Sequence, residues 1–371
     1  MFTKLADIFH RSQRTFEAFQ IEASTYSALE CRVCPRDVFG ERWVYQNLSM
    51  ETFERIEQHF HLTQWVSFYG WGDPMENEHI FSMIRRAKEK GCSTGLSTNG
   101  THVDESLSGE LLSAGLDLMV IFVEVAAQEV RSTLGAGPDF QRIMDQVGRF
   151  IRSRNSHGSD TPKVKVSFPM TRMNLRELPG LVPLAVRMGV DEVGFHNLDY
   201  LPDESCNILR AFHHESPTAT FEKSLDEVRR AAKDLGLTVK TAPLKVEEKL
   251  VCELNPHRRV FFSAGGDVAP CPYLMIPKKG DIRRIFVNRV VHVPQTSFGN
   301  VRDEDFPAIW KKEPYRQFRD IFEQRNKAET NTVQLLDAFS NISASMLEQM
   351  TPKTPPPLSE LCRTCYKAYG I

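Results

Sequence analysis

The sequence predicts an α/β protein, a partial (β/α)6 TIM-like barrel of parallel strands followed by a small C-terminal α+β domain. Short apolar runs alternate with stretches of helical periodicity six times between residues 18 and 242. Beyond residue 243 the pattern changes to short strands and turns. The length of 371 residues also exceeds one domain of about 150 residues. Because six units are too few to close an eightfold barrel, we expect an open one.

The first three strand-helix units have clear signals. Ser49 is a typical N-cap residue, and apolar residues recur behind it at helical spacing. The predicted strands are 19–24, 65–69 and 94–97, and the predicted helices begin near 49, 80 and 106.

The next three units repeat this order. The predicted strands are 118–125, 164–168 and 192–196, and the predicted helices are 140–152, 178–188 and 218–235. Loops that follow parallel strands gather at one end of a barrel, so we expect functional residues directly after the strands.

We predict three regions along the chain. An N-terminal helix or extension covers 1–17, the barrel covers 18–242, and the C-terminal domain covers 243–371. A hairpin is expected around residues 260–266. A helical insertion is expected at about 326–357, with an amphipathic helix from Thr332 to Met350 and a stiff segment of four prolines after it.

Composition excludes several classes of protein. Apolar residues make up 41% and charged residues 25%, as in ordinary globular proteins. The net charge of −2 provides no positive field for nucleic acid, and no apolar run is long enough to span a bilayer. We therefore expect no nucleic-acid partner, no membrane partner and a cytoplasmic location. In that location eight cysteines indicate metal chemistry before disulfides.

Cysteines gather in two groups. Cys31 and Cys34 form a CxxC pair after the first strand. Cys252, Cys271, Cys362 and Cys365 form a second group, in which Gly266 allows the hairpin to bring Cys271 back beside Cys252. Four thiolates complete either a tetrahedral zinc site or a 4Fe-4S cluster, and their number alone does not separate the two. With zinc, the chain would be a zinc-stapled, non-enzymatic binding or scaffold protein.

Three further motifs accompany the cysteines. The loop after the second strand reads YGWGDP at 69–74, the third strand ends in LSTNG at 96–100, and the hairpin reads GDVAPCP at 266–272. In this order and placement the chain resembles the radical S-adenosylmethionine (SAM) superfamily, in particular members with a C-terminal twitch or SPASM-type auxiliary-cluster domain. The resemblance spans roughly residues 18 to 320 and the last ten or so.

The resemblance implies an oxidoreductase or maturase. SAM is cleaved reductively to a 5′-deoxyadenosyl radical, which abstracts a hydrogen from a peptide, a cofactor precursor or a small alcohol. It implies a SAM-binding 4Fe-4S cluster at Cys31, Cys34 and the degenerate position Ser27, and a second auxiliary 4Fe-4S cluster on Cys252, Cys271, Cys362 and Cys365. The implied partners are SAM, the substrate, and an electron donor such as flavodoxin or ferredoxin.

The resemblance also implies which residues bind SAM. Val33 lies near the adenine, the loop after the second strand receives the amino group, and the loop after the third strand lies beside the cofactor. The full set is Val33, Trp71, Gly72, Asp73, Pro74, Ser97, Thr98, Asn99, Gly100 and Asn174. Asn174 has the alternative role of a helix N-cap.

The sequence departs from the family pattern most at Ser27, where the CxxxCxxC motif requires a cysteine. A serine hydroxyl is a poorer iron ligand than a thiolate. Asp73 replaces a glutamate, Phe122 a frequent serine, and Leu134 a frequent arginine. Two interpretations follow: either Ser27 or an external ligand completes an active cluster, or the chain is a catalytically degenerate member of the family.

Overall fold

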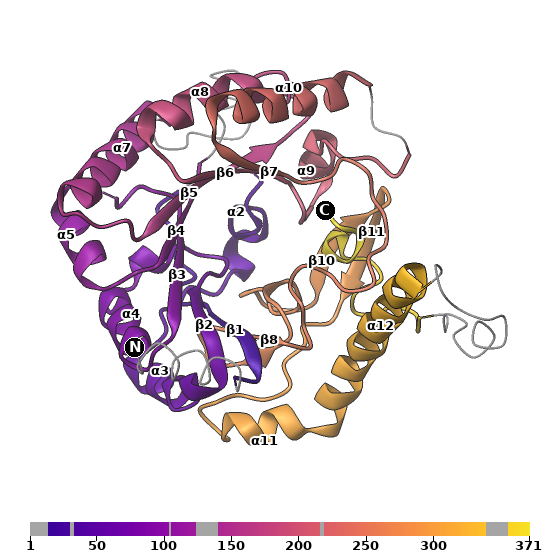
Figure 1. Ribbon diagram of the computed structural model, residues 1–371. Coiled ribbons are helices and arrows are strands. Elements are labelled where there is room, and N and C mark those ends of the chain that lie inside the picture. Colours follow the sequence, from indigo (N-terminus) through magenta and orange to yellow (C-terminus); the bar gives the residue numbers. More distant parts are fainter. Residues whose placement is uncertain (1–13, 30–32, 104, 124–139, 216–218, 339–354) are drawn as a thin grey trace.

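A nine-stranded sheet forms the centre of the protein, with strand order β7-β6-β5-β4-β3-β2-β1-β8-β9. The computed structural model describes residues 14–29, 33–103, 105–123, 140–215, 219–338 and 355–371. Neighbouring strands from β7 to β8 are parallel, and only the β8–β9 pair is antiparallel. The sheet curves, and helices α3, α4, α5, α7, α8 and α10 follow its outer side (Figure 1). This confirms the predicted α/β class and partial parallel barrel.

The six predicted barrel strands are all present, with ends shifted by a few residues. The sheet consists of β1 (Phe16–Ile21), β2 (Thr63–Phe68), β3 (Ser93–Thr98), β4 (Leu118–Phe122), β5 (Lys163–Met170), β6 (Glu192–Asn197), β7 (Thr238–Thr241), β8 (Arg259–Phe262) and β9 (Val268–Ala269). A separate antiparallel pair consists of β10 (Ile282–Phe286) and β11 (Arg289–Val293).

Helices cover the outer face of the sheet because their apolar stripes pack against it. Ser49 caps α3 as predicted, its hydroxyl accepting a hydrogen bond from the Thr52 amide at 3.2 Å. The barrel helices are α2 (Pro35–Phe39), α3 (Met50–Glu57), α4 (Ile80–Glu89), α5 (Glu105–Ser113), α7 (Phe140–Ser156), α8 (Leu178–Met188), α9 (Glu204–Leu209) and α10 (Ala219–Leu235). Helices α11 (Phe306–Lys311) and α12 (Glu313–Ala338) follow the sheet. Short 3-10 turns lie at Gly40–Arg42, Phe60–Leu62, Pro74–Glu76, Pro272–Leu274 and Tyr366–Tyr369.

Strand β1 lies between β2 and β8, so the sheet continues across the boundary predicted near residue 243. Val260, Phe261 and Phe262 are all buried, as expected for a strand covered on both faces. The hairpin between β8 and β9 turns at Gly266, whose φ is +87°. The hairpin expected in the C-terminal domain is therefore also an extension of the barrel sheet, and the three-region division stays a prediction.

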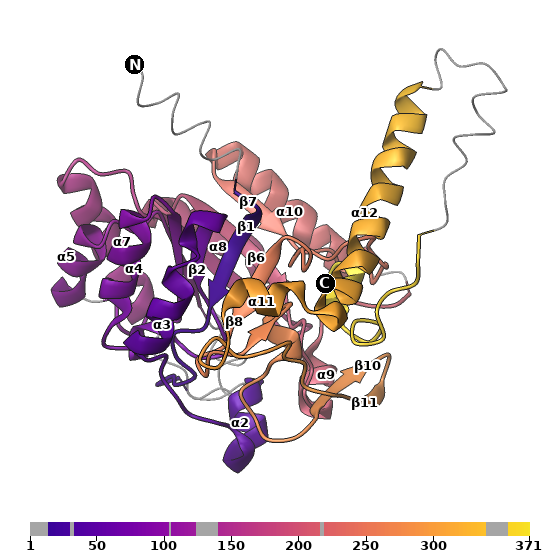
Figure 2. The ribbon, with the colours of Figure 1, turned by 90° about the horizontal axis from the view of Figure 1, so that it is seen from below.

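Two predicted boundaries differ from those in the structure. Strand β1 starts at Phe16, so residues 16 and 17 belong to the barrel and not to an N-terminal extension. Helix α12 starts at Glu313, well before the predicted Thr332, because Phe318 and Phe322 give it a buried face. The rest of the predicted insertion, from 339 to 354, lies outside the described residues. Figure 2 shows the first turns of α12 close to α11 and its far end projecting from the body.

Candidate functional site

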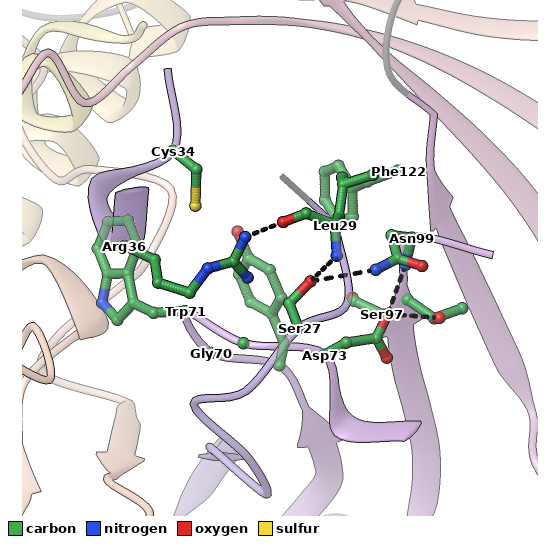
Figure 3. A pocket seen from close by; sticks show the side chains of 13 residues that line it. Ser27, Leu29, Cys34, Arg36, Gly70, Trp71, Asp73, Ser97, Asn99 and Phe122 are labelled. Carbon is green, nitrogen blue, oxygen red and sulfur yellow. Dashed lines mark hydrogen bonds between the residues drawn. The ribbon is translucent and has the colours of Figure 1, made fainter. Parts of the chain in front are cut away.

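A pocket with a cavity volume of about 150 Å³ opens where β1 to β4 end (Figure 3). Its position at the carboxyl ends of parallel strands is where barrels carry their chemistry. It is lined by Ser27, Leu29, Cys34, Arg36, Tyr69, Gly70, Trp71, Gly72, Asp73, Ser97, Thr98, Asn99 and Phe122. Eight of the predicted site residues therefore meet in one pocket: Ser27, Cys34, Trp71, Gly72, Asp73, Ser97, Thr98 and Asn99.

Asp73 joins the loops after β2 and β3. Its carboxylate accepts hydrogen bonds from the Asn99 amide at 2.8 Å, the Thr98 hydroxyl at 2.9 Å and the Met75 amide at 2.9 Å. Burial raises the pKa of Asp73, and the bonds from Asn99 and Met75 oppose that rise. With three donors on two oxygens, Asp73 holds the two loops together and is not a free acid in the pocket.

Gly70 and Gly72 allow the loop after β2 to lie directly on the end of β1. A Cβ atom on Gly72 would lie 2.5 Å from the Tyr26 carbonyl oxygen, and one on Gly70 would lie 2.5 Å from Cγ of Glu22. The neighbouring Asp73 amide donates to the same Tyr26 oxygen at 2.7 Å. Only glycine permits this approach, which places the backbone of residues 70–73 against the pocket.

Ser27 faces the pocket with its hydroxyl already engaged. Its Oγ accepts hydrogen bonds from the Leu29 amide at 3.2 Å and from Asn99 Nδ2 at 3.3 Å. Cys34, the residue before α2, lines the pocket on the side away from Asn99 (Figure 3). Arg36 donates a hydrogen bond to the Leu29 carbonyl and so connects the start of α2 with the loop after β1. Cys31 and Leu134 lie outside the described residues.

Four predicted residues do not line the pocket. Val33 packs with the cluster around Cys206 and Tyr366, Pro74 begins a 3-10 turn, and Gly100 is buried in the turn after β3. Asn174 bonds within its own loop: Oδ1 accepts from the Thr171 amide at 2.7 Å and Nδ2 donates to the Pro169 carbonyl at 2.8 Å. It does not cap α8, which follows Glu177. The SAM contacts of these four stay predictions.

The pocket also has an aromatic wall that was not among the predicted site features, although Phe122 was named as a departure from the family pattern. The rings of Tyr69 and Phe122 stack with centroids 5.8 Å apart, and Phe122 meets the ring of His196 edge-on at 5.3 Å. Burial lowers the pKa of His196 to about 4, so the imidazole is neutral, and its Nδ1 lies 2.9 Å from the Ser167 hydroxyl. The sequence signal was the position of Tyr69, Phe122 and His196 at or directly after strand ends.

The C-terminal cysteines form the second site. Cys252, Cys271, Cys362 and Cys365 line one enclosed cavity together with Tyr273, Phe318 and Phe322. Burial raises the pKa of Cys252 to about 11 and also raises the pKa values of Cys271 and Cys362, and the neighbouring sulfurs add to each rise. Among the residues that the structure describes, no three His, Cys, Asp or Glu side chains lie close enough to hold a single metal ion.

A half-buried lysine with two carboxylate partners borders this cavity. Lys367 lines it and contacts Asp199 at 2.7 Å and Glu253 at 2.5 Å. These carboxylates raise the pKa of Lys367 above its usual value against the effect of burial, so the ammonium stays charged. The Lys367–Asp199 pair links the loop after β6 to the C-terminal segment.

Comparison with known proteins agrees with this geometry. Residues 22–161 match the radical SAM superfamily, and residues 252–333 match the SPASM iron-sulfur cluster-binding domain. The tungsten-containing aldehyde ferredoxin oxidoreductase cofactor-modifying protein of Pyrococcus furiosus is 26% identical over 317 residues, which cover 81% of this chain and 82% of that one. The Fe-coproporphyrin III synthase of Methanosarcina barkeri is 24% identical, over 66% of this chain and 61% of that one.

The fold also resembles solved structures. SuiB of Streptococcus suis, solved with its precursor peptide SuiA, superposes with a TM-score of 0.58 at 17% identity and covers 85% of this chain and 70% of that one. The two matched regions identify a radical SAM domain followed by a SPASM-type iron-sulfur domain in this chain. Together, the two matched domains imply iron-sulfur cluster binding and SAM binding. No described helix is long and apolar enough to cross a membrane.

Proposed function

We propose that this protein binds SAM in the pocket at the ends of β1 to β4, cleaves it reductively and uses the 5′-deoxyadenosyl fragment to abstract a hydrogen from a cofactor precursor. The observation that carries the proposal is the convergence of Cys34, the 70–73 backbone and Asn99 on one pocket. A bound 4Fe-4S cluster supplies the electron for this chemistry, with a flavodoxin or ferredoxin as the donor.

The chain's own residues would position SAM and exclude water. The close approach of residues 70–73 would present main-chain groups to the amino group of SAM. Asp73 holds that backbone to the Thr98–Asn99 turn, so the two binding loops keep a fixed distance. Tyr69 and Phe122 supply an apolar wall, which limits the access of water to a reactive intermediate.

The donor set at the barrel is incomplete for a cluster with three thiolate ligands. Cys31 and Cys34 supply two, and the Ser27 hydroxyl is occupied by hydrogen bonds from Leu29 and Asn99. An external third ligand is therefore the simpler route to an active cluster. The same hydrogen bonds favour the second candidate, a degenerate member that keeps the pocket without radical initiation.

The C-terminal site fits an auxiliary 4Fe-4S cluster better than zinc. Four cysteine sulfurs line one cavity, yet among the described residues no three of them reach the spacing for one ion. A tetrahedral zinc ion needs all four within about 2.3 Å of itself, whereas a cubane spreads its thiolates over separate irons.

For the substrate, a cofactor precursor is favoured over a peptide. The Pyrococcus furiosus relative covers four fifths of this chain and modifies a cofactor, and the Methanosarcina barkeri relative makes Fe-coproporphyrin III. The likeness to SuiB, at 17% identity, concerns the fold alone.

The test is anaerobic reconstitution of the protein and of Ser27→Cys, followed by iron and sulfide analysis and by assay for 5′-deoxyadenosine after chemical reduction. We expect iron for a C-terminal cluster in both proteins, additional iron in Ser27→Cys, and 5′-deoxyadenosine in at least the variant. Cys92→Ala, a buried cysteine outside both sites, is the control. Absence of 5′-deoxyadenosine from both proteins would contradict radical activity, and zinc without sulfide would favour the scaffold function.

A further inference from the structure

Two side chains connect the proposed SAM loop with the hairpin that carries Cys271. The first is Glu22, which is fully buried at the end of β1. Its carboxylate accepts a hydrogen bond from the Trp71 amide at 2.9 Å through one oxygen and from the Ala264 amide at 3.3 Å through the other. One carboxylate thus spans a loop of the barrel and the β8–β9 hairpin.

The second connection is the indole of Trp71. Its Nε1 donates to the carbonyl of Pro272 at 2.9 Å, and Pro272 directly follows Cys271. The ring also packs edge-on against Tyr273 and Tyr200, with centroid distances of 5.4 and 5.3 Å. Tyr273 in turn lines the four-cysteine cavity. Trp71 therefore has its backbone in one site and its ring against the wall of the other.

The loop that carries Cys34 is fixed to the same region. The Val44 amide donates to the Pro277 carbonyl at 2.8 Å, and the Lys279 amide donates to the Arg42 carbonyl at 2.8 Å. Phe39 of α2 belongs to the same apolar cluster as Tyr273 and Trp71. Both loops of the proposed SAM site consequently rest on the segment around Cys271.

We propose that Trp71 and Glu22 are positioning residues that couple the two sites, so that occupancy of the four-cysteine site orders the 70–73 loop and strengthens SAM binding. This rests on the proposed function for the identity of both ligands. When the cavity is filled, Cys271 and Tyr273 are held in one position. The hydrogen bond from Trp71 Nε1 to the Pro272 carbonyl then holds the 70–73 loop in place, because this bond breaks if the indole changes rotamer. Coupling between binding sites is reciprocal, so SAM also stabilises the four-cysteine site.

The test is a double-mutant cycle read by hydrogen exchange, which needs no turnover. The reconstituted full-length protein is compared with Cys362→Ala, Trp71→Phe and the double variant. Cys362 lines the cavity and Trp71 contacts Pro272 and Tyr273, so each change acts on its own end of the connection. Phenylalanine keeps a ring but removes Nε1–H. Deuterium uptake is followed in a peptide covering 69–76, with β5 as the reference peptide.

We expect Cys362→Ala to speed exchange in the 69–76 peptide about tenfold, within the usual range of coupling effects, and to leave β5 unchanged. In the Trp71→Phe background the same change should add less than about threefold. An equal effect of Cys362→Ala in both backgrounds, or no effect in either, would overturn the coupling. Cys92→Ala controls for the loss of a buried thiol.

A second measurement is needed if Cys362→Ala also speeds hydrogen exchange in the β5 reference peptide. Equilibrium dialysis with SAM should give an affinity about tenfold weaker for Trp71→Phe than for the parent protein, with equal iron content. Equal SAM affinities at equal iron content would also overturn the coupling. A protein that forms no 5′-deoxyadenosine, yet shows the exchange coupling, would contradict the proposed function and leave this inference standing.

Discussion

Replacing Glu22 with glutamine should change how stability depends on pH. Burial raises the pKa of Glu22 from 4.5 to about 7, against the effect of its bonds from Trp71 and Ala264. The folded protein therefore keeps the proton to higher pH than the unfolded chain does. Because the folded state binds more protons, the free energy of unfolding falls as pH rises from about 4.5 through 7. The full loss is about 3 kcal/mol, at about 1.4 kcal/mol for each pKa unit.

A workable window is pH 6 to 8, where the folded carboxyl titrates and the unfolded one is already ionised. Linkage with the two pKa values gives a loss of about 1.3 kcal/mol across that window. Urea unfolding of the parent protein and Glu22→Gln at both pH values measures the difference, since the other groups titrate alike in both. Glutamine offers one oxygen to two amides, so the variant should start about 1 kcal/mol less stable at pH 6. An equal fall in stability in both proteins would refute a titrating Glu22.

Three further outcomes are expected. Gly72→Ala should abolish measurable SAM binding and lower the melting temperature, because its Cβ would meet the Tyr26 carbonyl at 2.5 Å, whereas Gly109→Ala in α5 has open space and should stabilise by about 0.5–1 kcal/mol. Lys367→Met should destabilise the protein by about 3–5 kcal/mol in thermal unfolding, because Asp199 loses its ion-pair partner in a mostly buried position. Asp73→Asn should weaken SAM binding and lower the free energy of unfolding in urea by about 1–3 kcal/mol. The new side-chain NH2 group would replace an acceptor oxygen and would face the Thr98 hydroxyl or the Asn99 amide, which are donors.

The barrel was predictable because its strands and helices have strong, repeated patterns. Ser49 and the apolar periodicity behind it led to α3 directly. Strand β7 was not predicted from the sequence, because its four residues, Thr238–Thr241, are at most half-buried and lack an apolar run. Strand β8 was expected as part of a hairpin, but its parallel pairing with β1 joins residues more than 240 positions apart, which no local pattern encodes.

The pocket was predictable where loop sequence constrains backbone, as at Gly72 and Asp73. It was not predictable where the role depends on a tertiary neighbour. Asn174 follows a strand, yet it bonds to its own loop, and nothing in the sequence distinguishes that from a contact in the pocket. Tyr69 and Phe122 form a wall only because β2 and β4 curve toward each other in the folded sheet.

The position of β1 explains why the two sites meet. Strand β1 pairs with β2 on one side and with β8 on the other. Residues directly after β1 therefore lie next to both matched domains. Glu22 is the first such residue, and its two carboxylate oxygens divide between those domains. Ser27 lies five residues further on, on the same loop. A change in the C-terminal site therefore has a short path to the position where the barrel lacks its cysteine, and the behaviour of Ser27→Cys should be measured with the four-cysteine site intact.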